Sequence, residues 1–375
     1  MADSKEHNIY EAECARIRRR LALAAVGLLA LFFLFLSLGS TSFRLIPPGQ
    51  TVQNLWLGLR LTLAKYLKWS FYDQRRRLME NAPAYMETMT RLQGGLLSAA
   101  LGAMLAIAGT VFQCVFRNPL AGPNLLGVSS GISIGNLLLV LQFSTAAASM
   151  TTMRFLYGYA CSIGLLLLIF LAGWAAGRGK GSVMDMLLTG CVFSRIIPRV
   201  VSSLQYYYMD EMEYLTLQEM SLYGTGTGNT KGAVFLIAAL AAGMLPLLLW
   251  SNSLNLVTFS DEEAWTMGLD TRWLRVLSLI CSTVLLIAAQ IHCGDVGMLA
   301  MLTPHLCRYL FGSDTQRLIP GSILLGAGIM LLCRFITALF AFHPYLWVVS
   351  INVLVSLFAM PLMMLVMLKY RRGWN

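Results

Sequence analysis

Residues 127–131 offer the clearest prospect of covalent chemistry, because Gly127, Ser129 and Gly131 fit the Gly-x-Ser-x-Gly pattern of serine hydrolases. His305 is the histidine that could act as general base. A nucleophilic serine needs a base within hydrogen-bonding reach, and the sequence does not place one near Ser129. Small residues at the start of a membrane helix commonly allow close helix packing. We prefer this packing role, with an intramembrane hydrolase as the alternative.

Nucleotide chemistry is predicted to be absent from this chain. The nearest approach to a phosphate-binding loop is residues 177–182, Gly-Arg-Gly-Lys-Gly-Ser. Its first glycine is misplaced, and Lys180 is followed by Gly181 where the motif requires Ser or Thr. We therefore expect no ATP hydrolysis by this chain and no cofactor of its own.

The sequence also gives little support for a metal-binding site. The eight cysteines are scattered without a Cys-x-x-Cys pair, which favours buried apolar packing over a metal cluster or disulfide framework. His305 lies near an expected helix end, where capping or hydrogen bonding is a commoner role than metal ligation. Most of the 21 methionines lie singly in apolar segments, so flexible packing explains them better than soft-metal binding. We predict no metal site.

Three arginines interrupt otherwise apolar segments: Arg195, Arg199 and Arg334. Charged residues inside a bilayer are costly and usually functional. An ion-coupled secondary transporter would also need a carboxylate near the bilayer midplane, and we find none that is well placed. A transporter powered by a partner protein is therefore the preferred reading, with the secondary transporter as the alternative.

The elements that carry these residues are predicted to be membrane helices. Of the 375 residues, 57% are apolar and 12% charged, and the mean hydropathy is +0.66. So few polar residues cannot cover a soluble globule. Because a span needs about 20 apolar residues, we expect an all-α polytopic membrane protein with ten spans, near 20–38, 92–115, 124–142, 153–176, 184–206, 233–250, 277–292, 295–310, 319–341 and 346–369.

Basic residues set the expected topology. Four arginines, Arg16, Arg18, Arg19 and Arg20, lie before the first span, and Lys369, Arg371 and Arg372 follow the last. Lys and Arg concentrate on cytoplasmic flanks, so residues 1–19 and 370–375 are predicted to be cytoplasmic, which requires an even number of spans. A nine-span reading is the alternative, because Gly294, Asp295 and Gly297 interrupt one long apolar run. The net charge of +10 thus reflects topology, and we infer no nucleic-acid partner.

Residues 39–91 form a basic segment that this topology places outside. Leu55, Trp56, Leu59, Leu63, Tyr66 and Leu67 recur there at helical spacing among the charges. This pattern predicts an amphipathic helix in the outer membrane interface. A solvated loop is the alternative.

A pair of short helices is predicted on the cytoplasmic face at 254–275, within the membrane core of 92–369. Ser260 and Glu263 form a capping box, and Gly268 suits the left-handed position after a helix end. Asp270 or Thr271 can then cap a second helix. The resulting helix, sharp turn and helix could seat in a groove of another protein.

Three ordered motifs resemble the FecCD-type permeases, which are membrane subunits of ABC importers for ferric siderophores, haem and cobalamin. The first motif is Arg117-Asn118-Pro119-Leu120-Ala121-x-Pro123-x-Leu125-Leu126-Gly127-Val128-Ser129-x-Gly131. The second is Gly294-x-Val296-Gly297 followed by Pro304-His305-x-x-Arg308. Between them lies Leu254-Asn255 … Glu263-Ala264 … Gly268-Leu269 … Leu274-Arg275, which is similar to the family's ATPase-coupling region. The resemblance runs from about residue 91 to the C-terminus.

The resemblance implies a type II ABC importer permease in the bacterial cytoplasmic membrane. Two permeases, identical or related, would pair around a central pathway, with two cytoplasmic ATPases binding ATP and Mg and an extracytoplasmic binding protein delivering the ligand. An iron chelate, either a ferric siderophore or haem, is the expected cargo, with cobalamin as the alternative. The chain departs from the family's pattern at the outer docking arginines, where only Arg91 remains, so the ligand does not follow from the resemblance.

The resemblance also implies roles for individual residues. The expected cytoplasmic gate comprises Asn118, Pro119, Leu120, Gly181 and Ser182. The ATPase-coupling residues are expected to be Ser260, Asp261, Glu262, Glu263, Ala264, Gly268 and Leu269. Arg91 is expected to take part in docking the binding protein. The translocation pathway is expected to include Gln113, Met360, Met363 and Met364.

Overall fold

The computed structural model describes residues 2–38, 46–66, 83–119, 121–122, 127–143, 151–176, 183–210, 230–259, 266–268, 271–294, 296–340 and 351–372. Within these ranges every regular element is a helix, which confirms the all-α prediction. The helices are α1 (Ala2–Leu38), α2 (Pro48–Tyr66), α4 (Pro83–Val115), α5 (Val128–Phe143), α7 (Thr151–Ala176), α8 (Val183–Tyr208), α10 (Thr230–Leu249), α11 (Ser251–Phe259), α13 (Thr271–Cys293), α14 (Gly297–Phe311), α15 (Thr315–Phe340) and α16 (Ile351–Arg372).

Each of the ten predicted spans falls on a separate helix. By length and composition alone, five of the described helices could cross a membrane, or six if the bent pair of α10 and α11, at 61°, is one span. The interruption near Gly294 divides two helices, because Gly294 adopts a φ of 76° between α13 and α14. The single helix through this point that the nine-span alternative invoked is therefore not formed, and the number of membrane crossings stays a prediction.

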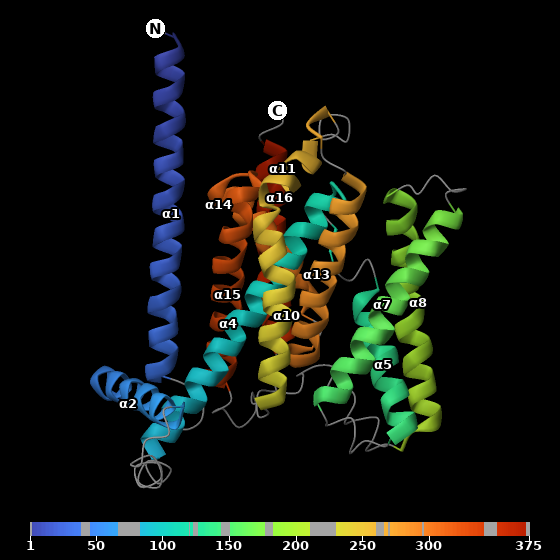
Figure 1. Ribbon diagram of the computed structural model, residues 1–375, viewed down its shortest axis with the longest axis horizontal. Coiled ribbons are helices and arrows are strands. Elements are labelled where there is room, and N and C mark those ends of the chain that lie inside the picture. Colours follow the sequence, from blue (N-terminus) through green and yellow to red (C-terminus); the bar gives the residue numbers. More distant parts are fainter. Residues whose placement is uncertain are drawn as a thin grey trace.

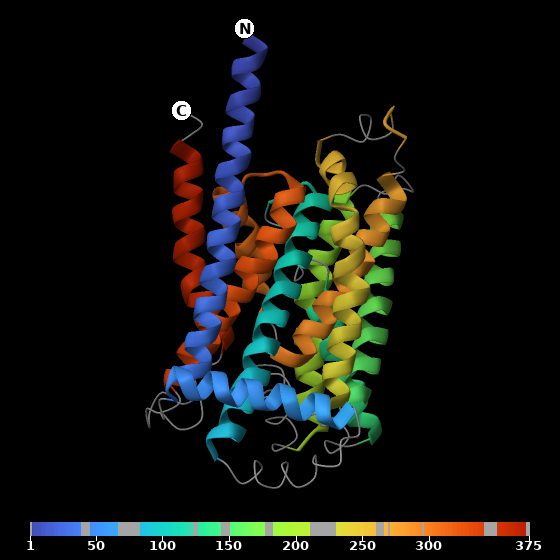
Figure 2. The same cartoon turned by 60° about the vertical axis from the view of Figure 1, so that its left-hand side comes forward.

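The long helices run side by side, and α2 lies across one end of them. Figures 1 and 2 show the start of α1, the end of α16 and the short α11 at the opposite end from α2. The described helices thus place both chain ends on the same side of the bundle, as an even number of crossings requires. The segment predicted as 1–19 is not separate from the first span, since α1 continues from Ala2 to Leu38.

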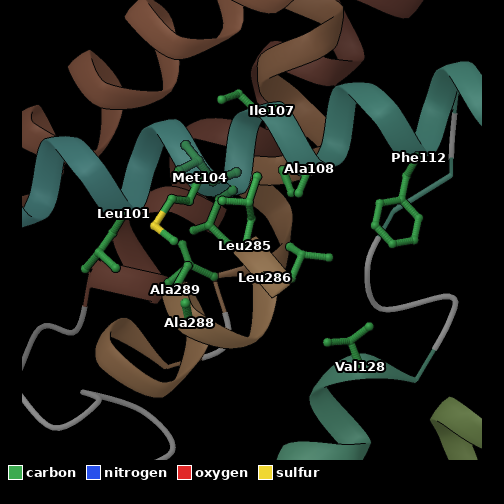
Figure 3. Close-up of a cluster of buried hydrophobic side chains, with 14 of the residues drawn as sticks. Leu101, Met104, Ile107, Ala108, Phe112, Val128, Leu285, Leu286, Ala288 and Ala289 are labelled. Carbon is green, nitrogen blue, oxygen red and sulfur yellow. The ribbon is translucent and has the colours of Figure 1, made fainter. Parts of the chain in front are cut away.

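Helix α4 is central and packs against α13, α14 and α15. Figure 3 shows Leu101, Met104 and Ala108 of α4 facing Leu285 and Ala289 of α13. Glycines permit the closest contacts: a Cβ on Gly102 would lie 2.2 Å from the Gly326 carbonyl oxygen, and one on Gly109 would lie 1.8 Å from that of Ala300. The small side chains predicted to aid packing therefore bring whole backbones together.

The amphipathic segment predicted around 55–67 corresponds to α2. Its Trp56 and Leu59 are exposed, while Thr51 is buried. On the inner side, the Asn54 amide donates to the Thr88 hydroxyl of α4 at 3.0 Å. An apolar face thus points away from the bundle at the end where an interfacial helix is expected.

Candidate functional site

Arg117 joins the end of α4 to α11. Its Nε and Nη2 donate to the Val257 carbonyl oxygen at 2.9 and 2.7 Å. Arg117 has a φ of 48°, a conformation uncommon for non-glycine residues. The motif at the end of α4 is therefore held to the last turn of α11, directly before the predicted coupling residues.

Two of the predicted gate residues lie within the described ranges, directly after Arg117. Asn118 is half-buried and its carbonyl accepts from the Ala121 amide at 3.0 Å, which closes a turn, and Pro119 is exposed. Proline lacks an amide hydrogen and cannot continue the α4 ladder. Leu120, Gly181 and Ser182 lie outside the described residues, so their gate role stays a prediction.

The coupling segment is described only in part. Gly268 has the predicted left-handed conformation, with a φ of 79°, and α13 begins at Thr271 as expected. Gly268 and Trp273 are exposed at this end of the molecule, where a partner could reach them. The remaining predicted coupling residues lie outside the described ranges: Ser260, Asp261, Glu262, Glu263, Ala264 and Leu269.

A second connection links α11 to α15. The Asn255 side-chain oxygen accepts from the Thr315 amide at 3.3 Å and from the Thr315 hydroxyl at 3.2 Å. Helix α11 is therefore attached both to the α4 junction and to the first turn of α15.

Gln113 lies between α4 and α14 and is 2% exposed. Its amide nitrogen donates to the Met301 carbonyl at 3.2 Å, and its amide oxygen accepts from Arg308. The His305 Nδ1 lies 2.9 Å from the same Met301 carbonyl, in keeping with the predicted hydrogen-bonding histidine. Gln113 here bridges two helices, and its assignment to the translocation pathway stays a prediction.

Ser129 has a partner other than a histidine. Its hydroxyl accepts from the Gln290 amide of α13 at 2.9 Å. Two residues further on, a Cβ on Gly131 would lie 2.4 Å from the Ser162 Cα, so α5 and α7 touch through backbone atoms. These contacts support the packing role of the Gly-x-Ser-x-Gly segment.

Arg91 lies inside the protein, 1% exposed. Its Nη1 donates to the carbonyls of Leu36 and Ser37 at 3.0 and 3.2 Å, and its Nη2 pairs with Glu87. A cation at these carbonyls satisfies the end of α1. The guanidinium is therefore not on the surface that a docking protein would contact, and the contacts observed are structural.

The α16 methionines divide between two environments. Met360 and Met364 are 67% and 65% exposed, whereas Met363 is buried in a cluster with Leu302 and Ala359. The exposed pair is accessible to a pathway or a second subunit, and its role stays a prediction. Among the described residues, no group of three or more His, Cys, Asp or Glu could hold a metal ion.

The Arg117 junction could not be found from the sequence motifs, because its partner lies 140 residues away. The sequence identified Arg117 only as part of the first family motif. It identified Asn255 only as part of the predicted coupling region. The pairing depends on how α10 and α11 return to the end of α4.

The fold is that of an ABC importer permease. A solved metal-chelate type ABC transporter in an inward-facing conformation matches with a TM-score of 0.71 and 24% identity, covering 94% of this chain and 99% of that one. This similarity confirms the predicted architecture.

The chain belongs to the FecCD transport family, which matches residues 27–369. The hemin transport system permease HmuU of Yersinia pestis is 33% identical over 248 residues, 64% of this chain and 71% of that protein. The Fe(3+) dicitrate permease FecC of Escherichia coli is 28% identical over 318 residues, covering 79% and 89%. The family match begins before residue 91, so it extends further than the motifs alone indicated.

Proposed function

We propose that this chain, a permease component of an ABC importer, takes up an iron chelate by alternating access. The Arg117–Val257 junction carries the proposal, because it joins the gate motif to the segment expected to contact an ATPase. Relatives for hemin and Fe(3+) dicitrate support an iron chelate as cargo. Cobalamin is the alternative within the family.

Two short polar junctions would convert ATPase motion into gate motion. Movement of α11 would be transmitted to α4 through Arg117 and to α15 through Asn255. Pro119 prevents a continuous helix beyond α4, which leaves a short barrier that can separate when the helices rock. The chain itself would bind no nucleotide, since ATP and Mg would be held by the ATPases.

The complete importer would contain four further components. We expect a second permease, identical or related, two cytoplasmic ATPases and an extracytoplasmic binding protein, in a bacterial cytoplasmic membrane. Both termini would be cytoplasmic, because they lie at the end that carries α11 and exposed Trp273.

The test is co-purification of the tagged permease in lipid, followed by ATPase and uptake measurements. ATP turnover stimulated by a binding protein loaded with haem, ferric siderophore or cobalamin would establish the importer and its cargo class. Substitution of Glu263 by Arg should release the ATPase while the permease stays folded. A permease that purifies alone and transports without ATP would instead indicate an ion-coupled secondary transporter.

A further inference from the structure

Two arginines lie one turn apart near the middle of α8. Arg195 is about 18 Å along the axis from Val183 and about 20 Å from Tyr208, at 1.5 Å per residue. Arg199 is one turn closer to Tyr208. Arg334 of α15 differs, because it is about 9 Å from the last residue of its helix, close enough to snorkel toward the interface.

Both arginines face away from the rest of the described chain. Helix α8 packs against α5 and α7 and stands at the edge of the molecule in Figure 1. Arg195 and Arg199 are exposed, as are Val192 and Tyr206 on the same helical face, while Val201 on the opposite face is buried. The arginines therefore belong to a surface stripe along α8.

No carboxylate within the described residues neutralises the pair. Neither arginine forms an ion pair there, and neither α5 nor α7 contains an acidic residue. The nearest acidic residues along the chain are Asp185 and Asp210, each about 15 Å or more away along the helix axis. Within the described residues, the two positive charges thus have no compensating carboxylate on α5 or α7.

Lipid cannot readily cover this stripe. An arginine at the centre of a membrane helix is costly to insert, and α8 carries two of them. The stripe must therefore face water or another protein.

We propose that Arg195 and Arg199 form a cationic subsite that binds an anionic metal chelate in a water-filled pathway between this chain and a second permease. This inference rests on the proposed function. A guanidinium binds carboxylates through paired, charge-assisted hydrogen bonds. Arginines about one helical pitch apart can engage two carboxylates of one ligand, such as the propionates of haem or the citrates of ferric dicitrate.

The subsite favours charged over uncharged cargo. Carboxylate-bearing chelates replace the water lost by the guanidinium groups, whereas a chelate without anionic groups leaves two desolvated charges unpaired. Cyanocobalamin carries no free carboxylate and a single phosphodiester anion, so it should gain less from the pair than a chelate with two carboxylates.

The test uses the purified, lipid-embedded complex with haemin, ferric dicitrate and cyanocobalamin as probes. Binding is measured by titration in the absence of binding protein, and ATP-driven uptake in its presence. Arg195→Gln and Arg199→Gln should each weaken binding of the anionic probe that is transported by about tenfold or more. The double lysine variant should retain an intermediate affinity, and added salt should weaken wild-type binding more than that of the glutamine variants.

Arg60→Gln provides a matched control, because Arg60 is an exposed arginine on α2 and should leave binding unchanged. Unchanged affinity in the α8 variants, with wild-type uptake intact, would overturn the subsite but not the importer. Dissociation of the permease pair in those variants would assign the arginines to subunit contact instead. Uptake of cyanocobalamin alone by the wild-type protein would exclude a site that selects carboxylate-bearing chelates. Absence of ATP-driven uptake of every probe would refute the proposed function and the subsite together.

Discussion

Replacing Arg117 with Asn is expected to weaken the coupling of ATP hydrolysis to transport. The substitution removes both hydrogen bonds to the Val257 carbonyl, at 2.9 and 2.7 Å. Asparagine is suitable because it tolerates the positive φ of this position better than most residues, so the backbone turn should persist. The change therefore removes the connection without removing the turn.

The size of the effect follows from the donor. Hydrogen bonds from charged groups contribute roughly 1.5–3 kcal/mol, and partial exposure of Arg117 reduces this to about 1–2 kcal/mol. A coupling free energy of about 1–2 kcal/mol corresponds to roughly 5- to 30-fold. We expect the number of chelates transported per ATP hydrolysed to decrease by this factor.

The assay compares uptake and phosphate release in the same proteoliposomes. Basal ATPase activity should persist in Arg117→Asn, while uptake falls. Arg117→Lys should lie between the variant and wild type, because lysine keeps the charge but loses the planar fork. An unchanged ratio of uptake to hydrolysis in Arg117→Asn, with normal assembly, would refute the coupling role.

Three further substitutions test the packing and the assignments. Arg91→Met should lower the stability of the permease by about 2–4 kcal/mol, because it removes the cap of α1 and the ion pair with Glu87. The affinity of the folded fraction for the binding protein should stay the same. Thermal unfolding and a pull-down separate the two effects, and lost affinity without lost stability would restore the docking role. Gly109→Val should lower stability by at least about 1–3 kcal/mol, since its side chain would meet the Ala300 backbone; an unshifted unfolding curve would argue against that contact. Ser129→Ala should reduce uptake less than about threefold, since it removes one hydrogen bond from Gln290, whereas loss of all activity would favour the hydrolase alternative.

The helices could be predicted from the sequence because they depend on local features, namely the length of each apolar segment and the charges that flank it. The interruption at Gly294 illustrates this, because a glycine in a left-handed conformation ends α13. The basic termini likewise predicted chain ends on one side of the bundle. Gly268 was likewise predictable, since its role depends on a single backbone angle.

The roles of individual side chains were harder to predict from the sequence, because they depend on partners far away along the chain. Arg91 looked like a docking residue at the start of a span, yet its acceptors are carbonyls 54 and 55 residues earlier. Gln113 bonds to a carbonyl 188 residues later. No local sequence pattern predicts such pairings, because the two partners come together only when the helices pack.

The two attachments of α11 differ in strength, and this difference sets the expected order of movement. The Arg117 bonds to Val257 are charge-assisted and measure 2.9 and 2.7 Å, whereas those from Thr315 to Asn255 are neutral and measure 3.3 and 3.2 Å. Charge-assisted hydrogen bonds are roughly twice as strong as neutral ones. A force that displaces α11 should therefore release α15 before α4, so that the end of α4 and its gate motif follow the coupling segment.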